Sequence, residues 1–80
     1  MNKNALIAER ICEIRRVLYG DYGIELLART LNVPTATWLN YERGVTMSAH
    51  VMLGFIETTG SDPHWLLTGE GEHYAVRSFR

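Results

Sequence analysis

The segment from Leu27 to Gly44 constrains the fold more than any other part of this chain. Ala28 is a small residue at a position where two helices must approach each other closely, and Asn32 follows it one turn later. Asparagine adopts the left-handed backbone conformation more readily than most residues that carry a side chain. Pro34 has a backbone φ that suits the first turn of a helix, and it lacks an N–H group that would be unpaired there. The segment therefore predicts two short helices that meet at a tight corner.

The rest of the chain also has the periodicity of helices. The buried side of a first helix is marked by apolar residues at helical spacing, namely Ile7, Ile11, Ile14 and Leu18. Ser48 and Asp62-Pro63 are typical helix starts, and Gly60 and Gly69 are typical helix ends. The expected helices run from Asn2 or Asn4 to about Tyr19, from Ile24 to Leu31, from Pro34 to Arg43, from Ser48 to Thr59 and from Asp62 to Thr68. We therefore expect an all-α, compact five-helix bundle.

Length and composition set the outer limits of this interpretation. The 80 residues suffice for one domain, and the formal net charge of −1 is unusual for a protein that binds nucleic acid. The single Cys12 excludes an intramolecular disulfide, and we expect it to be a buried thiol. No apolar run approaches the roughly 18 residues of a membrane-spanning helix, and no leader pattern is present. We therefore expect a soluble cytoplasmic protein with no membrane partner.

Five short blocks together resemble a known family. The blocks are Arg10-Ile11, Ile14-Arg15, Leu27-Ala28, Tyr41-Glu42-Arg43-Gly44 and Trp65-Leu66-Leu67-Thr68-Gly69-Glu70-Gly71. In this order and spacing they resemble the lambda-repressor-like helix-turn-helix domain, and the last block is especially similar to phage-repressor N-terminal domains. The resemblance covers roughly residues 5 to 71, and it implies a domain over 1–71 followed by a tail over 72–80. It also implies an internal ion pair between Arg15 and Glu42, although both could instead be solvated surface charges.

In a helix-turn-helix the second helix enters the major groove of DNA. If Trp38 faces inward with Tyr41 or Thr37, the outward positions of this helix are Thr35, Ala36, Leu39, Asn40 and Arg43. Asn40 is the best candidate for reading a base, because asparagine can bind adenine through two hydrogen bonds. Arg29 and Arg43 are the main candidates for phosphate contacts, with Arg16, Lys3 and Arg10 as further cations. The sequence thus predicts a transcription regulator that binds double-stranded DNA, as a repressor-like homodimer.

Other features favour a different use of the same scaffold. Ile24 stands where the family often has a polar residue that grips a phosphate, and the loop after Gly44 contains no basic residue. Asp21 and Glu25 would repel a phosphate near the start of the second helix. The apolar Ala36 and Leu39 could dock a partner helix. A scaffold for protein–protein interaction without specific DNA binding is therefore the alternative.

Two further groups of residues complete the sequence-based expectations. His50, His64 and His73 are too far apart for a local metal motif, and no nucleophile elbow or phosphate-binding loop occurs. We therefore expect no enzyme, no metal and no cofactor. The tail carries three large apolar residues, Tyr74, Val76 and Phe79. We expect them either to fold back on the bundle or to join a dimer contact.

Overall fold

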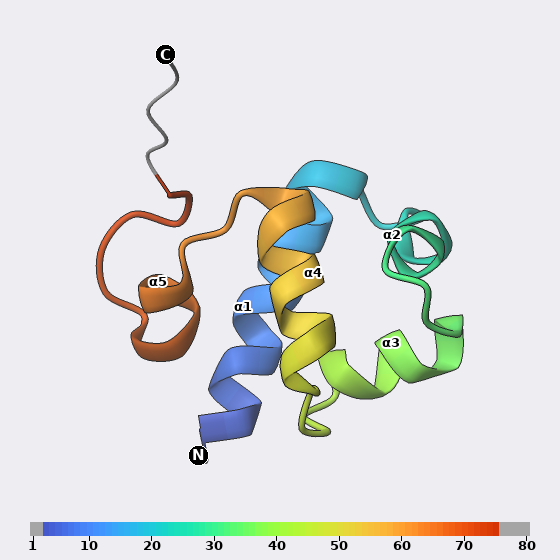
Figure 1. Cartoon of the computed structure of the whole chain (residues 1–80), viewed down its shortest axis with the longest axis horizontal. Coiled ribbons are helices and arrows are strands. Elements are labelled where there is room, and N and C mark those ends of the chain that lie inside the picture. The colour runs from blue at the N-terminus through green and yellow to red at the C-terminus, as the bar shows by residue number, and fades with distance from the viewer. Residues whose placement is uncertain (1–2, 76–80) are drawn as a thin grey trace.

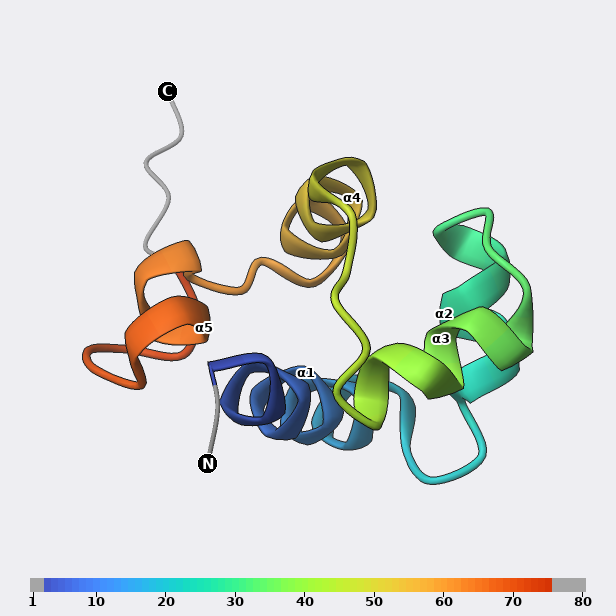
Figure 2. The same cartoon turned by 90° about the horizontal axis from the view of Figure 1, so that it is seen from below.

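A computed structural model describes the backbone of residues 3–75 and the side chains of residues 6–75. This part of the chain is all-helical and contains no β-strand. Its helices are α1 (Lys3–Tyr19), α2 (Ile24–Thr30), α3 (Thr35–Glu42), α4 (Ala49–Thr59) and α5 (Pro63–Thr68). α1 and α4 lie in the middle, α2 and α3 lie at one end, and α5 lies at the other end (Figures 1 and 2). None of these helices is both long and apolar enough to cross a membrane.

Local signals set the ends of α4 and α5 as the sequence predicts. The Ser48 hydroxyl accepts a hydrogen bond from the Val51 amide, and the Asp62 carboxylate accepts bonds from the amides of His64 and Trp65. Gly60 and Gly69 end these helices in the left-handed conformation, where a Cβ atom would be strained. The prediction for Pro34 was wrong by one position. Pro34 precedes α3 as its N-cap with an extended backbone, and Thr35 is the first helical residue.

The core is built around Trp38, whose side chain is fully buried. Its ring stacks on Phe55 with the centroids 5.4 Å apart and meets Tyr41 edge-on at 6.0 Å. The other buried apolar residues come from α1, α2, α4 and α5 and are Ala8, Ile11, Ile14, Leu27, Ala28, Val51, Trp65 and Leu66. Because one core joins every helix, the position of α3 depends on the whole bundle.

The last turn of α1 departs from the predicted apolar stripe. Leu18 is 46% exposed, whereas the charged Arg15 is 5% exposed. Tyr19, the next residue, packs against the core in place of Leu18 and lies directly against Gly23. The chain turns into α2 at this point, so Leu18 is left at the surface. Cys12, expected to be buried, is half-buried, and its thiol accepts a 3.7 Å hydrogen bond from Arg15.

The segment after α5 returns to the bundle. The imidazole of His73 stacks on the Trp65 ring at a centroid distance of 3.9 Å, and its Nδ1 lies 3.2 Å from a carboxylate oxygen of Glu13. Ser61 and Tyr74 form an isolated β-bridge, and the Ala75 amide donates to the Gly60 carbonyl at 2.9 Å. Residues 73–75 therefore lie against α5 and the turn before it. Val76 and Phe79 lie outside the described residues.

Candidate functional site

The corner between α2 and α3 is fixed by backbone geometry. Asn32 has a φ of 60°, the left-handed conformation expected from the sequence. The Val33 amide donates to the Ala28 carbonyl at 3.0 Å, and the Asn32 amide donates to the Arg29 carbonyl at 3.0 Å. Leu27 and Ala28 hold this end of α2 in the core. The corner therefore sets the direction in which α3 leaves α2.

A buried ion pair holds the inner side of α3 to α1. Arg15 and Glu42 are joined by two hydrogen bonds, from Nη2 to Oε1 at 2.8 Å and from Nε to Oε2 at 3.0 Å. Their side chains are 6% and 8% exposed. Nη1 of Arg15 also donates to the Gly20 carbonyl at 3.0 Å, beyond the end of α1. The pair that the family resemblance implies is thus present, and it lies inside the bundle.

Sequence reasoning missed the third member of this cluster. The indole Nε1 of Trp38 donates to Oε2 of Glu42 at 2.6 Å. The signal was available, because the two residues are four positions apart on one helix and a buried indole N–H needs an acceptor. Among the described residues no buried side-chain nitrogen or oxygen lacks a hydrogen-bond partner. The α1–α3 contact therefore combines close packing with complete hydrogen bonding.

The cluster shifts the proton affinities of its members. Burial by itself would raise the pKa of Glu42, but the hydrogen bonds from Arg15 and Trp38 and the charge of Arg15 outweigh it. The pKa of Glu42 therefore lies below its ordinary value. The hydrogen bond with Glu42 raises the pKa of Arg15 against the opposing effect of burial. Burial and the neighbouring carboxylate raise the pKa of the Cys12 thiol. Both members of the pair are consequently charged in the folded protein.

The outer side of α3 faces solvent. Thr35, Ala36, Asn40 and Arg43 are exposed, and Leu39 is half-buried. The helix ends at Glu42, where the amides of Arg43 and Val45 donate to the Asn40 carbonyl at 3.1 and 3.0 Å. The predicted outward residues therefore share one accessible surface, although Leu39 offers less of its side chain than expected. We call Thr35, Ala36, Leu39, Asn40 and Arg43 the α3 outer face.

Arg29 lies beside the start of this face. It lines an open hollow together with Glu25, Asn32, Val33, Pro34 and Thr35. Its Nη2 lies 3.6 Å from Oε2 of Glu25, one turn earlier on α2. The hollow brings Arg29 close to Thr35, as a shared role of the two residues would require.

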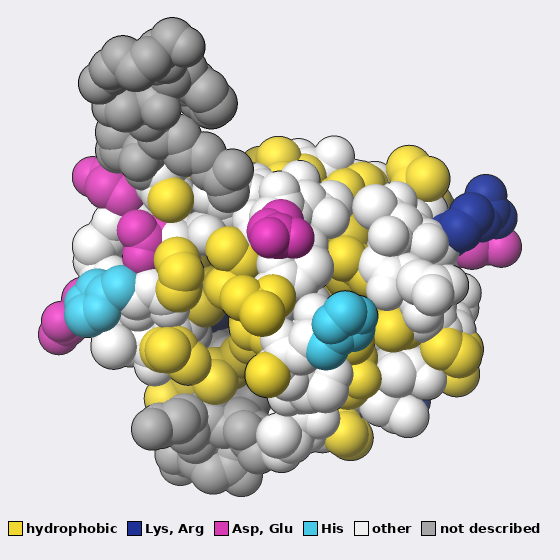
Figure 3. Space-filling view, in the orientation of Figure 1, with side chains coloured by type: hydrophobic (Ala, Val, Ile, Leu, Met, Phe, Trp, Pro, Cys, Tyr) yellow, Lys and Arg dark blue, Asp and Glu magenta, His cyan; other side chains and the backbone are white. Residues whose placement is uncertain are grey.

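Within residues 6–75, the remaining cations contribute little to the α3 outer face. Nη1 of Arg10 donates to the Leu66 carbonyl at 3.0 Å, so this guanidinium is used in holding α5. Arg16 lies 3.9 Å from Asp21 in an exposed ion pair. The Lys3 side chain lies outside the described residues. In the view of Figure 3, the main basic area is at the α2 end, directly beside an acidic side chain.

Comparisons with known proteins identify no relative. No protein-family model, curated protein or solved structure matches this chain. The site must therefore be interpreted from its own geometry.

Proposed function

We propose that this chain is a small sequence-specific DNA-binding regulator of the helix-turn-helix type. One observation carries the proposal. α3 is anchored from within by Trp38 and Glu42, while its other side presents exposed polar groups after a tight corner. A helix held in this way can enter a major groove about 12 Å wide without loss of its own packing. The resemblance of five sequence blocks to lambda-repressor-like domains supports the same function.

Each residue of the α3 outer face has a chemical role in this proposal. Asn40 reads adenine through the N6 and N7 edge, and Thr35 contacts a base edge or a phosphate. Ala36 and Leu39 present apolar surface that suits a thymine methyl group. Arg43 and Arg29 bind phosphates at the two ends of α3, where their charges position the helix without reading sequence. The protein thus recognises DNA through one strong base contact and a small number of phosphate contacts.

Such a sparse face favours a homodimer on a palindromic site. A two-fold dimer would place two copies of α3 about 34 Å apart, on successive turns of the major groove. Doubling the contacts compensates for an α3 of 8 residues that carries one strong base-reading side chain. A repressor-like regulator in the cytoplasm fits this arrangement.

Replacing Asn40 with alanine tests the proposed base contact. We expect Asn40→Ala to lose discrimination at one base position by about 1–3 kcal/mol, because a bidentate adenine contact is removed. Arg43→Gln is the matched control, since it removes a phosphate contact. It should weaken binding to all sequences alike and reduce the salt slope by about one. The measurement is selection from genomic DNA fragments at low and moderate salt, followed by titration of the retained sequences.

The wild-type result decides the proposal. If the wild-type chain retains no fragment even at low salt, the DNA-binding function is wrong. If Asn40→Ala keeps the wild-type sequence preference, the base contact is assigned to the wrong residue.

A second candidate function is docking of a partner protein, and the distribution of charge favours it. Arg16 and Arg29 each lie beside a carboxylate, so the described residues place little uncompensated positive charge around the α3 outer face. Leu26 on α2 and Leu53 on α4 are more than half exposed. Because the DNA-binding proposal also includes a homodimer, retention of DNA fragments, and not assembly by itself, separates the two functions. Self-assembly in light scattering that is lost in Leu26→Ala, together with absence of DNA retention, would support docking between copies of this chain.

A further inference from the structure

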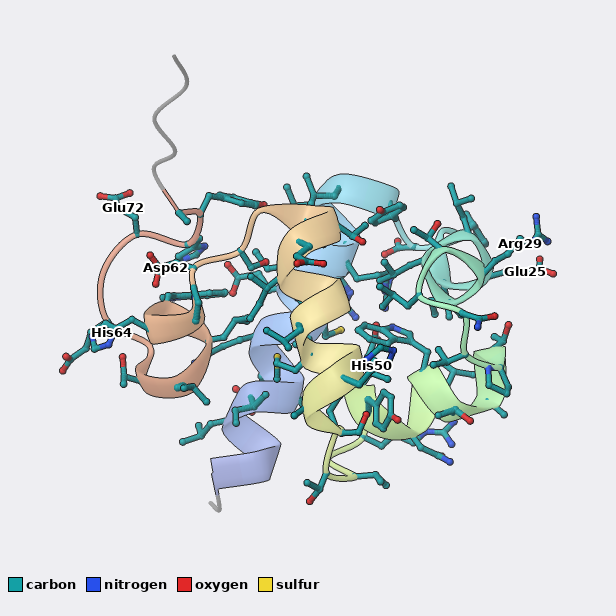
Figure 4. All side chains as sticks on the ribbon, viewed as in Figure 1. Glu25, Arg29, His50, Asp62, His64 and Glu72 are labelled. Atoms are coloured by element: carbon teal, nitrogen blue, oxygen red, sulfur yellow. The ribbon has the colours of Figure 1, made fainter. Side chains whose placement is uncertain are left out.

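We propose that Glu25 sets the DNA affinity of this protein by restraining Arg29, an inference that rests on the proposed DNA-binding function. Glu25 and Arg29 lie one helical turn apart on α2, with Oε2 and Nη2 separated by 3.6 Å. Their side chains are 75% and 74% exposed, and both extend outward from α2 at the same end of the molecule (Figure 4). The pair is therefore accessible to a large charged partner.

The surroundings of the pair connect it to the α3 outer face. Glu25 and Arg29 line the same open hollow as Asn32, Pro34 and Thr35. A phosphate that approaches Thr35 along this hollow meets the Arg29 guanidinium and the Glu25 carboxylate together. The carboxylate competes with the phosphate for Arg29, and its negative charge also repels the phosphate.

Among the described residues, the other cations cannot replace Arg29 at this end of α3. Arg10 is bound to the Leu66 carbonyl. Nε of Arg16 lies 3.9 Å from Oδ1 of Asp21. Arg43 is at the opposite end of α3. Phosphate attraction is independent of sequence, so a residue that lowers it increases the relative weight of the base contacts. Glu25 is thus a specificity-determining residue that acts through Arg29.

The test is a double-mutant cycle between Glu25→Gln and Arg29→Gln. The probe is a short mixed-sequence DNA duplex, titrated at low and moderate salt. An exposed ion pair of this kind is worth about 0.3–0.5 kcal/mol, which corresponds to about a twofold change in affinity. With the repulsion also removed, Glu25→Gln should bind about threefold to tenfold more tightly at low salt. In the Arg29→Gln background the direct repulsion by Glu25 persists, so the gain from Glu25→Gln should fall by about a factor of two, to about 1.5-fold to fivefold.

Glu72→Gln is the matched control, because it removes the same charge at the opposite end of the molecule (Figure 4). It should change the affinity much less than Glu25→Gln does. Equal DNA binding by the wild type and Glu25→Gln would overturn this inference and leave the proposed function intact. If Glu25→Gln increases DNA affinity as much in the Arg29→Gln background as in the wild type, the effect does not act through Arg29. If Glu72→Gln increases DNA affinity as much as Glu25→Gln does, the effect is not specific to the Glu25–Arg29 pair. Absence of DNA binding by every variant would overturn both proposals.

Discussion

Replacing Glu42 with alanine is expected to lower the free energy of unfolding by about 3–5 kcal/mol. The substitution leaves the guanidinium of Arg15 buried without its counter-ion, and it removes the acceptor of the Trp38 indole. An unpaired buried charge costs more than a surface pair contributes, because the interior cannot solvate it. The measurement is urea denaturation followed by far-UV circular dichroism, with the fluorescence of Trp38 and Trp65 as a second probe.

Two control variants separate charge from packing in this cluster. Glu42→Gln keeps an oxygen acceptor for Trp38 but removes the negative charge. The loss in free energy of unfolding in this variant therefore measures the contribution of the charge. The double variant Arg15→Met/Glu42→Leu removes both charges and should be less destabilised than Glu42→Ala. If Glu42→Ala lowers the free energy of unfolding by less than about 1 kcal/mol, the Arg15–Glu42 pair behaves like an exposed ion pair. That result would contradict the role of the pair in holding α3 to α1.

The same carboxylate makes stability depend on pH. The pKa of Glu42 is lower in the folded protein than its ordinary value of 4.5, because Arg15 and Trp38 stabilise the charged form. Its contribution is therefore fully present above the pKa of the unfolded chain, and it is lost as pH falls through the folded pKa. We expect the wild type to lose stability as pH falls below about 4.5, more steeply than Glu42→Gln does. Acid titrations followed by circular dichroism measure the two slopes. Equal loss of stability with falling pH in the wild type and Glu42→Gln would refute this expectation.

Gly23→Ala is expected to destabilise the protein by about 2–3 kcal/mol, since overpacking at a rigid contact costs about this much. An added Cβ atom at this position would overlap the carbonyl oxygen and the Cβ atom of Tyr19. Backbone cannot move aside as a flexible side chain can, so α2 would have to shift relative to α1. The φ of Gly23 is −92°, so the expected cost arises from lack of space and not from backbone strain. The thermal midpoint of unfolding reports the change.

Gly54→Ala is the matched control for this substitution. At Gly54, inside α4, the nearest atom to an added Cβ is a methyl group of Leu31 at 3.5 Å, an ordinary contact. Alanine in a helix interior is more favourable than glycine by about 0.5–1 kcal/mol, so Gly54→Ala should raise the midpoint. If both substitutions change stability equally, the close approach of α1 and α2 at Gly23 does not limit the fold.

Local sequence determined most of the helix boundaries and the corner. Ser48 and Asp62 supply hydrogen-bond acceptors to the amides that follow them, and Gly60, Gly69 and Asn32 adopt the left-handed conformation. These choices depend on a residue and its near neighbours, so they can be predicted from a single sequence. The same holds for the α3 outer face, because helical periodicity fixes which residues lie opposite Trp38.

Tertiary structure decided how the charges are used. The sequence marks Arg10, Arg15 and Arg29 as similar cations, yet Arg10 holds α5 through a carbonyl at position 66 and Arg15 is buried with Glu42. Of these three, only Arg29 is exposed beside the α3 outer face, and Glu25 lies next to it. These partners are up to 56 residues apart in the chain, so no local preference encodes them. The sequence by itself therefore determined the helices and the corner between α2 and α3, whereas only the packed bundle decided which charges reach the surface, because burial and pairing depend on contacts between distant segments.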